Sequence, residues 1–292
     1  MQRRTARNHR PIWAYAAALA AVWLAVPAAQ AQPAAPVPVP PAERLAAVDT
    51  TLLQPAARRA IAASLARWQA LPPLPVGRWL LVNIPAYEIH LFDGPARVGT
   101  WRAIVGKAKT PTPTFVGEAK GVILNPWWDV PASIVAESVG RLVARQPKLA
   151  ASRGYVRDGD RYRQRPGPEN QLGQMKLDFT NAHSIGIHDT PSKALFDRDK
   201  RALSHGCIRV DDPFGFAAAL LGPPESADSL KTVVATTSDT RRITFVQPIP
   251  VIVGYFTAEV ADDGSLRIFD DVYRREPAKM ALISTETDCA IG

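Results

Sequence analysis

The sequence predicts a β-rich α+β fold. From residue 79 onward, short runs rich in Val, Ile and Leu recur between Pro and Gly turns, a pattern typical of strands. Helical periodicity is confined to short segments such as 133–145 and 213–221. The chain has 292 residues, which is enough for one sizeable domain with appendages.

The strand-like runs can be placed in order along the chain. Strands are expected at 79–84, 87–92, 100–105, 117–124, 176–179, 184–188, 232–236, 250–256 and 266–269. Residues 262–265, Asp-Asp-Gly-Ser, are expected to form the turn between the last two strands. The sequence shows no internal repeat.

Few helices are expected. Residues 43–71 contain helix formers with apolar spacing, and Pro55 divides them into two short helices because proline interrupts a helix interior. These helices predict a small appendage over 43–75. Residues 191–196 and 213–221 predict two further short helices.

An inserted, lid-like segment is expected at about 132–172. It opens with the helix candidate 133–145 and continues as a polar, weakly periodic stretch over 146–172. A long irregular segment inside a compact domain is usually functional or mobile. The alternative is a solvated insertion with no role in binding.

The N-terminus has the features of a secretory signal over residues 1–31. Several arginines precede the apolar run 12–26, and Ala29-Gln30-Ala31 follows as a small-x-small cleavage pattern. The run is shorter than the roughly 20 residues of a membrane-spanning helix. An uncleaved anchor is the alternative and the only membrane contact expected. Residues 32–42 form an Ala/Pro-rich linker, so an exported protein of the periplasm or cell envelope is predicted.

The composition does not indicate a nucleic-acid binder. The net charge is +8 and the pI is about 9.7, but most basic residues are dispersed and no zinc-finger or helix-turn-helix pattern occurs. A basic surface suits an anionic cell-wall polymer, or it serves solubility alone.

The chemistry is expected at Cys207, one of only two cysteines, which follows Ser204-His205-Gly206. A thiol attacks as the thiolate, so a catalytic cysteine needs a nearby base or cation that lowers its pKa. Gly206 leaves room for a substrate carbonyl, and the N–H groups of Gly206 and Cys207 can form an oxyanion hole. These features predict a Cys-His acyl-transfer site.

Two histidines are candidates to assist the thiol. His188 is expected to be the general base that takes the thiol proton and later returns it to the leaving amine. Asp189 either orients His188 or caps the turn that follows. His205 tunes the thiolate, contacts substrate, or makes a structural hydrogen bond within its loop.

Two residues are candidates for substrate binding. Arg209 can bind a peptide carboxylate as a planar fork, or it can pair with Asp211 or Asp212. Trp128 and its neighbour Trp127 wall a substrate groove or pack in the core.

A zinc hydrolase is the main rival class. Four candidate residues, His188, Asp189, His205 and Cys207, are possible zinc ligands. The chain has neither an H-E-x-x-H pattern nor a spaced Cys pair, so no metal and no cofactor is expected. The second cysteine, Cys289, is expected to be a tail thiol in the peripheral segment 275–292, since a disulfide would remove the nucleophile.

The order of the motifs resembles the L,D-transpeptidases, which have a YkuD-type catalytic domain, and within them the YcbB-like branch. The core of the resemblance is Ser204-His205-Gly206-Cys207 with His188 upstream. The resemblance extends from roughly Arg67 to Tyr273, through the motifs at 82–87, 105–107, 110–113, 125–131, 166–168, 172–173 and 188–191.

This resemblance implies a mixed β-sandwich or barrel with short helices and a lid, formed by a catalytic domain over 76–274. It also implies a role in cell wall biogenesis, in which a cysteine acyl-enzyme forms on a peptidoglycan tetrapeptide stem. The acceptor would be a second stem (a 3–3 cross-link), an envelope protein, or water, as in an L,D-carboxypeptidase or endopeptidase. A non-catalytic cell-wall-binding protein is the alternative from a different class.

Overall fold

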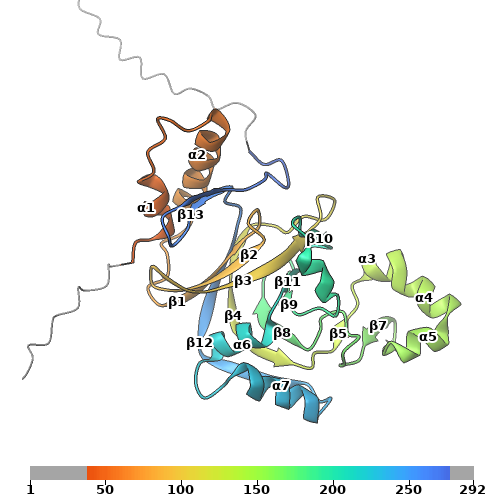
Figure 1. The fold of residues 1–292 in the computed structure, drawn as a ribbon. Helices are drawn as coiled ribbons and strands as arrows, with labels where there is room; N and C mark the ends of the chain where they lie inside the picture. The colour runs from red at the N-terminus through yellow and green to blue at the C-terminus, as the bar shows by residue number, and fades with distance from the viewer. Residues whose placement is uncertain (1–37, 277–292) are drawn as a thin grey trace, which may run out of the picture. The chain divides into compact units, whose positions relative to one another are not determined.

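The computed structural model describes residues 38–276 and contains a nine-stranded mixed sheet (Figure 1). The strand order is β10-β3-β11-β9-β8-β4-β12-β1-β2, and β2 also pairs with β3, so the sheet closes on itself like a barrel. Its strands are β1 (Arg78–Asn83), β2 (Glu88–Asp93), β3 (Ala96–Gly106), β4 (Phe115–Leu124), β8 (Met175–Thr180), β9 (Ile187–His188), β10 (Ala202–Ser204), β11 (Ile208–Val210) and β12 (Arg241–Gly254). The predicted β-rich α+β fold is confirmed.

Both faces of β1 are buried, against two different cores. Leu80 and Val82 point into the main core, whereas Trp79 and Leu81 point into a second core formed with the N-terminal helices. Alternate residues of a strand face opposite sides, which explains this division. The near-continuous apolar sequence of β1 therefore follows from its position inside the fold.

The second core joins helices α1 (Pro41–Ala46) and α2 (Pro55–Gln69) to the sheet. The ring of Trp68 on α2 stacks on Phe256 with centroids 4.1 Å apart. Pro55 occupies the first turn of α2, where its missing N–H costs no hydrogen bond. The two expected helices are therefore present on either side of residues 47–54.

Helices α6 (Pro213–Leu221) and α7 (Ala227–Thr236) follow β11, and α6 has the predicted bounds. The strand predicted at 232–236 is wrong, because these residues form the end of α7. A capping box between Ser226 and Ser229 starts the helix, and Leu230 buries its apolar face. Residues 191–196 overlap a 3-10 helix, η2 (Lys193–Asp197).

The inserted segment is more ordered than its composition predicts. It contains α3 (Ala132–Ile134), the π-helical η1 (Val135–Val139), α4 (Gly140–Arg145) and α5 (Pro147–Ser152). The segment also contributes β6 (Tyr155–Asp158) and β7 (Arg161–Gln164). These two strands form a small sheet with β5 (Trp128–Asp129), which precedes the segment, in the order β5-β7-β6.

The expectation of an irregular stretch over 146–172 is therefore wrong, and buried amides explain why. The side chain of Gln164 donates to the carbonyls of Arg153 and Glu169, and Asn170 donates to Pro126. Hydrophobic periodicity cannot predict the ordered structure of a segment that is stabilised mainly by hydrogen bonds from polar side chains.

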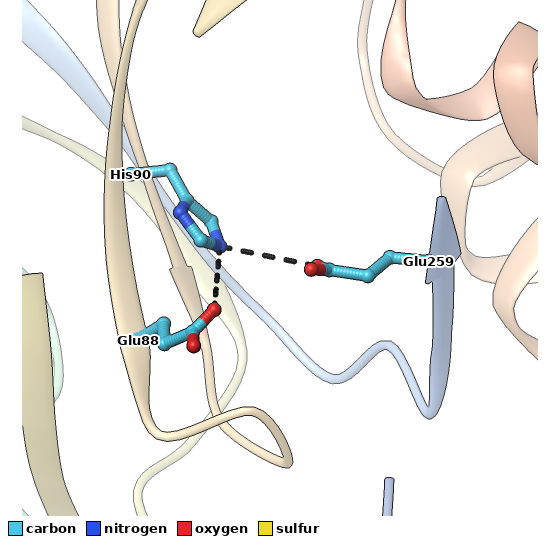
Figure 2. A group of neighbouring side chains, drawn as sticks. All are labelled: Glu88, His90 and Glu259. Atoms are coloured by element: carbon cyan, nitrogen blue, oxygen red, sulfur yellow. Dashed lines mark ion pairs between the residues drawn. The ribbon is translucent and has the colours of Figure 1, made fainter. Parts of the chain in front are cut away.

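A buried ionic cluster fastens the C-terminal hairpin of β13 (Ala258–Val260) and β14 (Leu266–Ile268) to β2 (Figure 2). Nε2 of His90 lies 3.5 Å from Glu88 and 3.9 Å from Glu259. Arg267 bridges the two carboxylates at 2.8 and 2.9 Å, so protein charge already balances them. Burial holds the pKa of His90 well below its usual value.

The expected turn at 262–265 joins the two strands of this hairpin. Gly264 adopts a φ of +84° at that turn, a conformation that favours glycine. Within residues 38–276, no helix has the length and apolar character needed to cross a bilayer. The expected signal segment 1–31 and Cys289 lie outside the described residues.

Candidate active site

Two neighbouring strands bring His188 and Cys207 together. His188 ends β9, Cys207 immediately precedes β11, and the two strands pair in parallel with Arg209 opposite His188. The parallel pairing places the two residues near each other although the 3-10 helix η2 and strand β10 separate them in sequence. The structure thus unites the predicted nucleophile and base.

A cavity of about 400 Å³ opens at this point. Its lining includes five predicted site residues and residues of the inserted segment, among them Cys207, His188, Arg209, His205, Trp128, Ile134 and Tyr155. A second cavity of about 470 Å³ is lined by Arg67, Phe115, Tyr255 and Arg275 and by none of the predicted site residues. The chemistry therefore belongs to the first cavity.

Gly186 leaves an opening between the two reactive side chains. A Cβ placed on Gly186 would lie 3.7 Å from Cδ2 of His188 and 3.8 Å from Sγ of Cys207. Both side chains therefore border the same small space. The absence of a side chain at Gly186 keeps that space available to a reacting group.

The imidazole of His188 is buried and neutral. Its Nδ1 lies 2.5 Å from the backbone carbonyl of Asp189. A carbonyl only accepts, so Nδ1 carries the proton and Nε2 is the basic atom. Burial lowers the pKa of His188 to about 4, helped by the charges of Arg209 and Lys176, while the carbonyls of Asp189 and Leu172 act in the opposite direction.

The thiol of Cys207 is also neutral at rest. Burial raises its pKa, although the N–H of Gly186, which donates to Sγ at 3.3 Å, and the nearby Arg209 act against this. The expectation of a pKa lowered by a neighbouring base is therefore not met in the free protein. A reaction through this thiol would therefore have to remove the proton as the sulfur attacks.

Asp189 fills both roles expected of it. Its backbone orients His188, and its side chain caps the turn that follows. The carbonyl orients His188, whereas the carboxylate accepts from the N–H groups of Gln174 at 2.9 Å and Thr190 at 2.6 Å and pairs with Lys193. The carboxylate approaches so closely that a Cβ on Gly173 would lie 2.2 Å from Oδ2. The side chain is thus a cap.

His205 lines the cavity, but its ring is bound to other groups than the thiol. Its Nε2 lies 2.9 Å from Oε2 of Glu137 in η1 and 3.3 Å from Nζ of Lys107. The expected tuning of the thiolate has no support in these contacts. His205 instead links the cysteine loop to the inserted segment.

One of the two expected oxyanion donors is already engaged. The N–H of Gly206 donates to Oγ of Ser204 at 3.1 Å, and that hydroxyl donates to the carbonyl of Cys207 at 2.5 Å. This corrects the assignment of Gly206 as a free donor. Within residues 38–276, the N–H of Cys207 has no hydrogen-bond acceptor.

Arg209 is free to bind a ligand. Asp211 pairs with Arg102 at 2.6 Å and Asp212 caps α6 through Gly215, so the alternative of an ion pair with either aspartate is wrong. Nε of Arg209 is buried and has no hydrogen-bond partner among the described residues. A half-buried guanidinium with an unpaired Nε beside a cavity favours an anionic ligand.

Trp128 lines the cavity from β5, with its ring 6.4 Å from that of Tyr155 on β6. The half-buried Trp128 thus meets the cavity rather than the core, whereas the neighbouring Trp127 packs under Arg163 at 4.6 Å. Sequence reasoning did not identify Tyr155 or Ile134, because nothing in the polar insertion marks them as lining residues.

The four residues proposed as zinc ligands point in different directions. The carboxylate of Asp189 faces the Gly173–Gln174 loop, and the ring of His205 faces Glu137. Of the four, only His188 and Cys207 lie within 4 Å of the position that a Cβ on Gly186 would occupy. This arrangement favours acyl transfer by a thiol and a base over a four-ligand metal centre.

Comparisons with known proteins indicate the family of the chain. Residues 77–235 match the family YkuD, the L,D-transpeptidase catalytic domain. A protein of Haemophilus influenzae named a putative L,D-transpeptidase is 26% identical over 221 residues, which are 66% of this chain and 44% of that protein. The chain therefore spans less than half the length of this relative.

Solved structures resemble the chain more distantly. An L,D-transpeptidase from Mycobacterium smegmatis has a TM-score of 0.33 and 15% identity, over 61% of this chain and 58% of that one. L,D-transpeptidase 3 from Mycobacterium tuberculosis, in complex with a faropenem-derived adduct, has a TM-score of 0.32 and 17% identity, over 61% and 60%. Similarity at this level carries no argument about function.

Proposed function

The chain belongs to the L,D-transpeptidase catalytic domain family (YkuD), and on that premise we propose that it is a cysteine-dependent peptidoglycan L,D-transpeptidase of the YcbB-like branch. The observation that carries the proposal is the cavity in which His188 and Cys207 border one space, both within the matched residues. The motifs at 125–131 and 188–191 support the branch.

In the first step, Nε2 of His188 takes the proton from the thiol of Cys207. The sulfur forms a bond to the carbonyl carbon of the donor peptide, and the π electrons of the carbonyl move to its oxygen. Because both groups are neutral at rest, proton transfer accompanies this attack. The N–H of Cys207 stabilises the resulting oxyanion.

In the second step, the oxyanion collapses and the bond from carbon to the leaving nitrogen breaks. His188 returns its proton to that nitrogen, so the terminal residue leaves as an amine and a thioester remains on Cys207. An acceptor amine then attacks the thioester, with His188 taking the amine proton, and the thiol is restored. Attack by water would give hydrolysis instead.

The substrate is proposed to be a tetrapeptide stem. Arg209 has a buried and unpaired Nε beside the thiol and would bind the terminal carboxylate of the stem. Trp128 and Tyr155 would form an apolar wall for the peptide. A second stem peptide or an envelope protein would supply the acceptor amine.

The inserted segment is proposed to act as a lid. It supplies Ile134 and Tyr155 to the cavity wall and contacts the cysteine loop through Glu137 and His205. The signal-like sequence of residues 1–31 supports export to the periplasm or cell envelope, where peptidoglycan lies.

The direct test is incubation of the purified protein with a disaccharide-tetrapeptide, followed by mass analysis. We expect loss of the terminal residue together with a cross-linked dimer, and no product with Cys207→Ala. Tripeptide alone would indicate hydrolysis. Product formation by Cys207→Ala at the wild-type rate would refute the proposed nucleophile.

A penem provides an independent probe, because its strained lactam carbonyl can acylate a nucleophilic thiol. We expect faropenem to add covalently to the wild-type protein and not to Cys207→Ala, as measured by intact mass. A non-catalytic wall-binding protein would not be acylated.

A further inference from the structure

The segment that follows β3 wraps around the cysteine loop. The N–H of Lys107 donates to the carbonyl of Ser204 at 2.9 Å, and Oγ1 of Thr110 donates to the same carbonyl at 3.2 Å. Two residues later, Oγ1 of Thr112 donates to the carbonyl of Gly206 at 2.7 Å. Thr112 is fully buried, so no solvent replaces this bond.

The hydroxyl of Thr112 both donates and accepts a hydrogen bond at this position. It donates to Gly206 and accepts from the N–H of Gly106 at 2.9 Å. The close approach depends on Gly106, since a Cβ there would lie 2.6 Å from N of Thr112. The chain thus brings one hydroxyl between two backbone groups that would otherwise be buried without partners.

The carbonyl that Thr112 holds belongs to the same peptide unit as the N–H of Cys207. The Gly206–Cys207 peptide is trans, and in a trans peptide the C=O and N–H point in opposite directions. Fixing the carbonyl toward Thr112 therefore directs the N–H of Cys207 away from Thr112. That N–H is the donor without an acceptor among the described residues.

Gly206 makes this control necessary. It adopts a φ of +119°, and glycine in such a conformation has a wide range of accessible backbone angles. A peptide unit next to a freely rotating glycine can turn and withdraw its N–H from the substrate. A fixed hydrogen bond to its carbonyl prevents that rotation.

We propose that Thr112 is a positioning residue that fixes the Gly206–Cys207 peptide so that the N–H of Cys207 stabilises the oxyanion. The inference rests on the proposed acyl transfer and deepens it. Thr112 is buried and does not line the cavity, so it acts through the peptide whose carbonyl it binds.

Tyr273 extends this support from the C-terminal segment. Its hydroxyl donates to the carbonyl of Gly106 at 2.6 Å and accepts from the N–H of Thr112 at 3.2 Å. Tyr273 lies outside residues 77–235, the part that matches the family. The geometry of the oxyanion donor thus depends on a part of the chain beyond the family match.

The test compares two reactions of the same sulfur. Acylation by faropenem forms the S–C bond, passes through an oxyanion and breaks the lactam C–N bond, so it needs the donor. Alkylation by iodoacetamide forms an S–CH₂ bond and releases iodide, and no oxyanion develops. The ratio of the two rates therefore reports on the donor and not on the general state of the thiol.

The variants are Thr112→Val, which keeps the shape and removes the hydroxyl, and Thr112→Ser, which keeps the hydroxyl. We expect Thr112→Val to lower the acylation rate by about 100-fold, the size of effect seen when one oxyanion donor is lost, with unchanged alkylation. Thr112→Ser should restore acylation to within a few fold of wild type.

Tyr273→Phe serves as the second variant if Thr112→Val does not fold, as checked by thermal melting. We expect it to lower acylation several-fold with unchanged alkylation. Acylation at the wild-type rate in Thr112→Val, or in Tyr273→Phe where only that variant folds, would overturn the proposal, as would an equal fall in both reactions. If wild-type protein is not acylated at all, the proposed function fails and this inference with it.

Discussion

The backbone carbonyl of Asp189, and not its carboxylate, holds Nδ1 of His188 at 2.5 Å. The carboxylate binds the N–H groups of Gln174 and Thr190 instead. Asp189→Asn should therefore keep kcat/KM within about 10-fold of wild type. Loss of a carboxylate that orients a catalytic histidine would cost about 10⁴-fold. Steady-state kinetics with the tetrapeptide distinguish the two.

Loss of the Asp189 carboxylate, which caps backbone N–H groups, should lower the stability of the protein more than its reaction rate. Asp189→Ala removes the acceptor for two backbone N–H groups and for Lys193, and each unsatisfied buried donor costs about 1–3 kcal/mol. We expect the free energy of unfolding to fall by about 2–4 kcal/mol in urea titration. A change below about 0.5 kcal/mol would contradict the assigned role.

Alkylation of Cys207 should show no thiolate at neutral pH. Burial raises the pKa of the Cys207 thiol and lowers the pKa of His188 to about 4. At neutral pH both side chains are therefore uncharged. The rate with iodoacetamide should be slower than that of a free peptide cysteine at pH 7 and rise toward alkaline pH. A plateau that begins below pH 7 would instead show an ion pair.

Arg209 should control affinity for the carboxylate end of the donor. Arg209→Gln should raise KM for a stem with a free carboxylate by about 10- to 100-fold, since a hydrogen bond to a charged group contributes about 1.5–3 kcal/mol. The same stem with a terminal amide is the matched control, and its KM should change little. An equal loss with both substrates would point to a structural role.

Protonation of His188 should destabilise the fold in acid. The unfolded protein binds a proton below pH 6.5, but the folded one does so only near pH 4, where its pKa lies. This contribution to stability is therefore present above pH 6.5 and is lost as pH falls toward 4, by up to about 1.4 kcal/mol per pH unit.

Melting curves from pH 7 to 4.5 check this. His188→Gln should show a weaker decline than wild type, whereas His183→Gln, at an exposed position, should decline in parallel with wild type. Parallel curves for wild type and His188→Gln would show that His188 titrates normally.

Local sequence was sufficient for most strands of the large sheet and for the candidate pair His188 and Cys207, although it wrongly predicted a strand at 232–236. Val- and Ile-rich runs between turns located β1 and β4, and the motif around Cys207 with His188 upstream singled out two residues that the structure places on neighbouring strands. These features depend on side chains at short spacing, which the sequence displays directly. The fold of α6 was equally accessible because Asp212 and Pro213 mark its start.

The remaining features depend on backbone groups, which every sequence contains. The carbonyl of Asp189 orients His188, and the carbonyl of Gly206 binds Thr112. The residue types at 189 and 206 do not predict these backbone contacts, because every residue has a carbonyl group. The helix at Ala227–Thr236 was missed for a different reason. The β-branched residues near its end favour a strand, but the capping box at its start stabilises the helix.

Strand β12 pairs with β4 on one side and in parallel with β1 on the other, where Val251 lies opposite Leu80. The barrel consequently cannot close until a ribosome has made the polypeptide through β12, which ends at Gly254. Pairings between such distant segments also form slowly. During synthesis the emerging polypeptide therefore carries Cys207 before it has the framework that orients this residue, and its reactivity is acquired late.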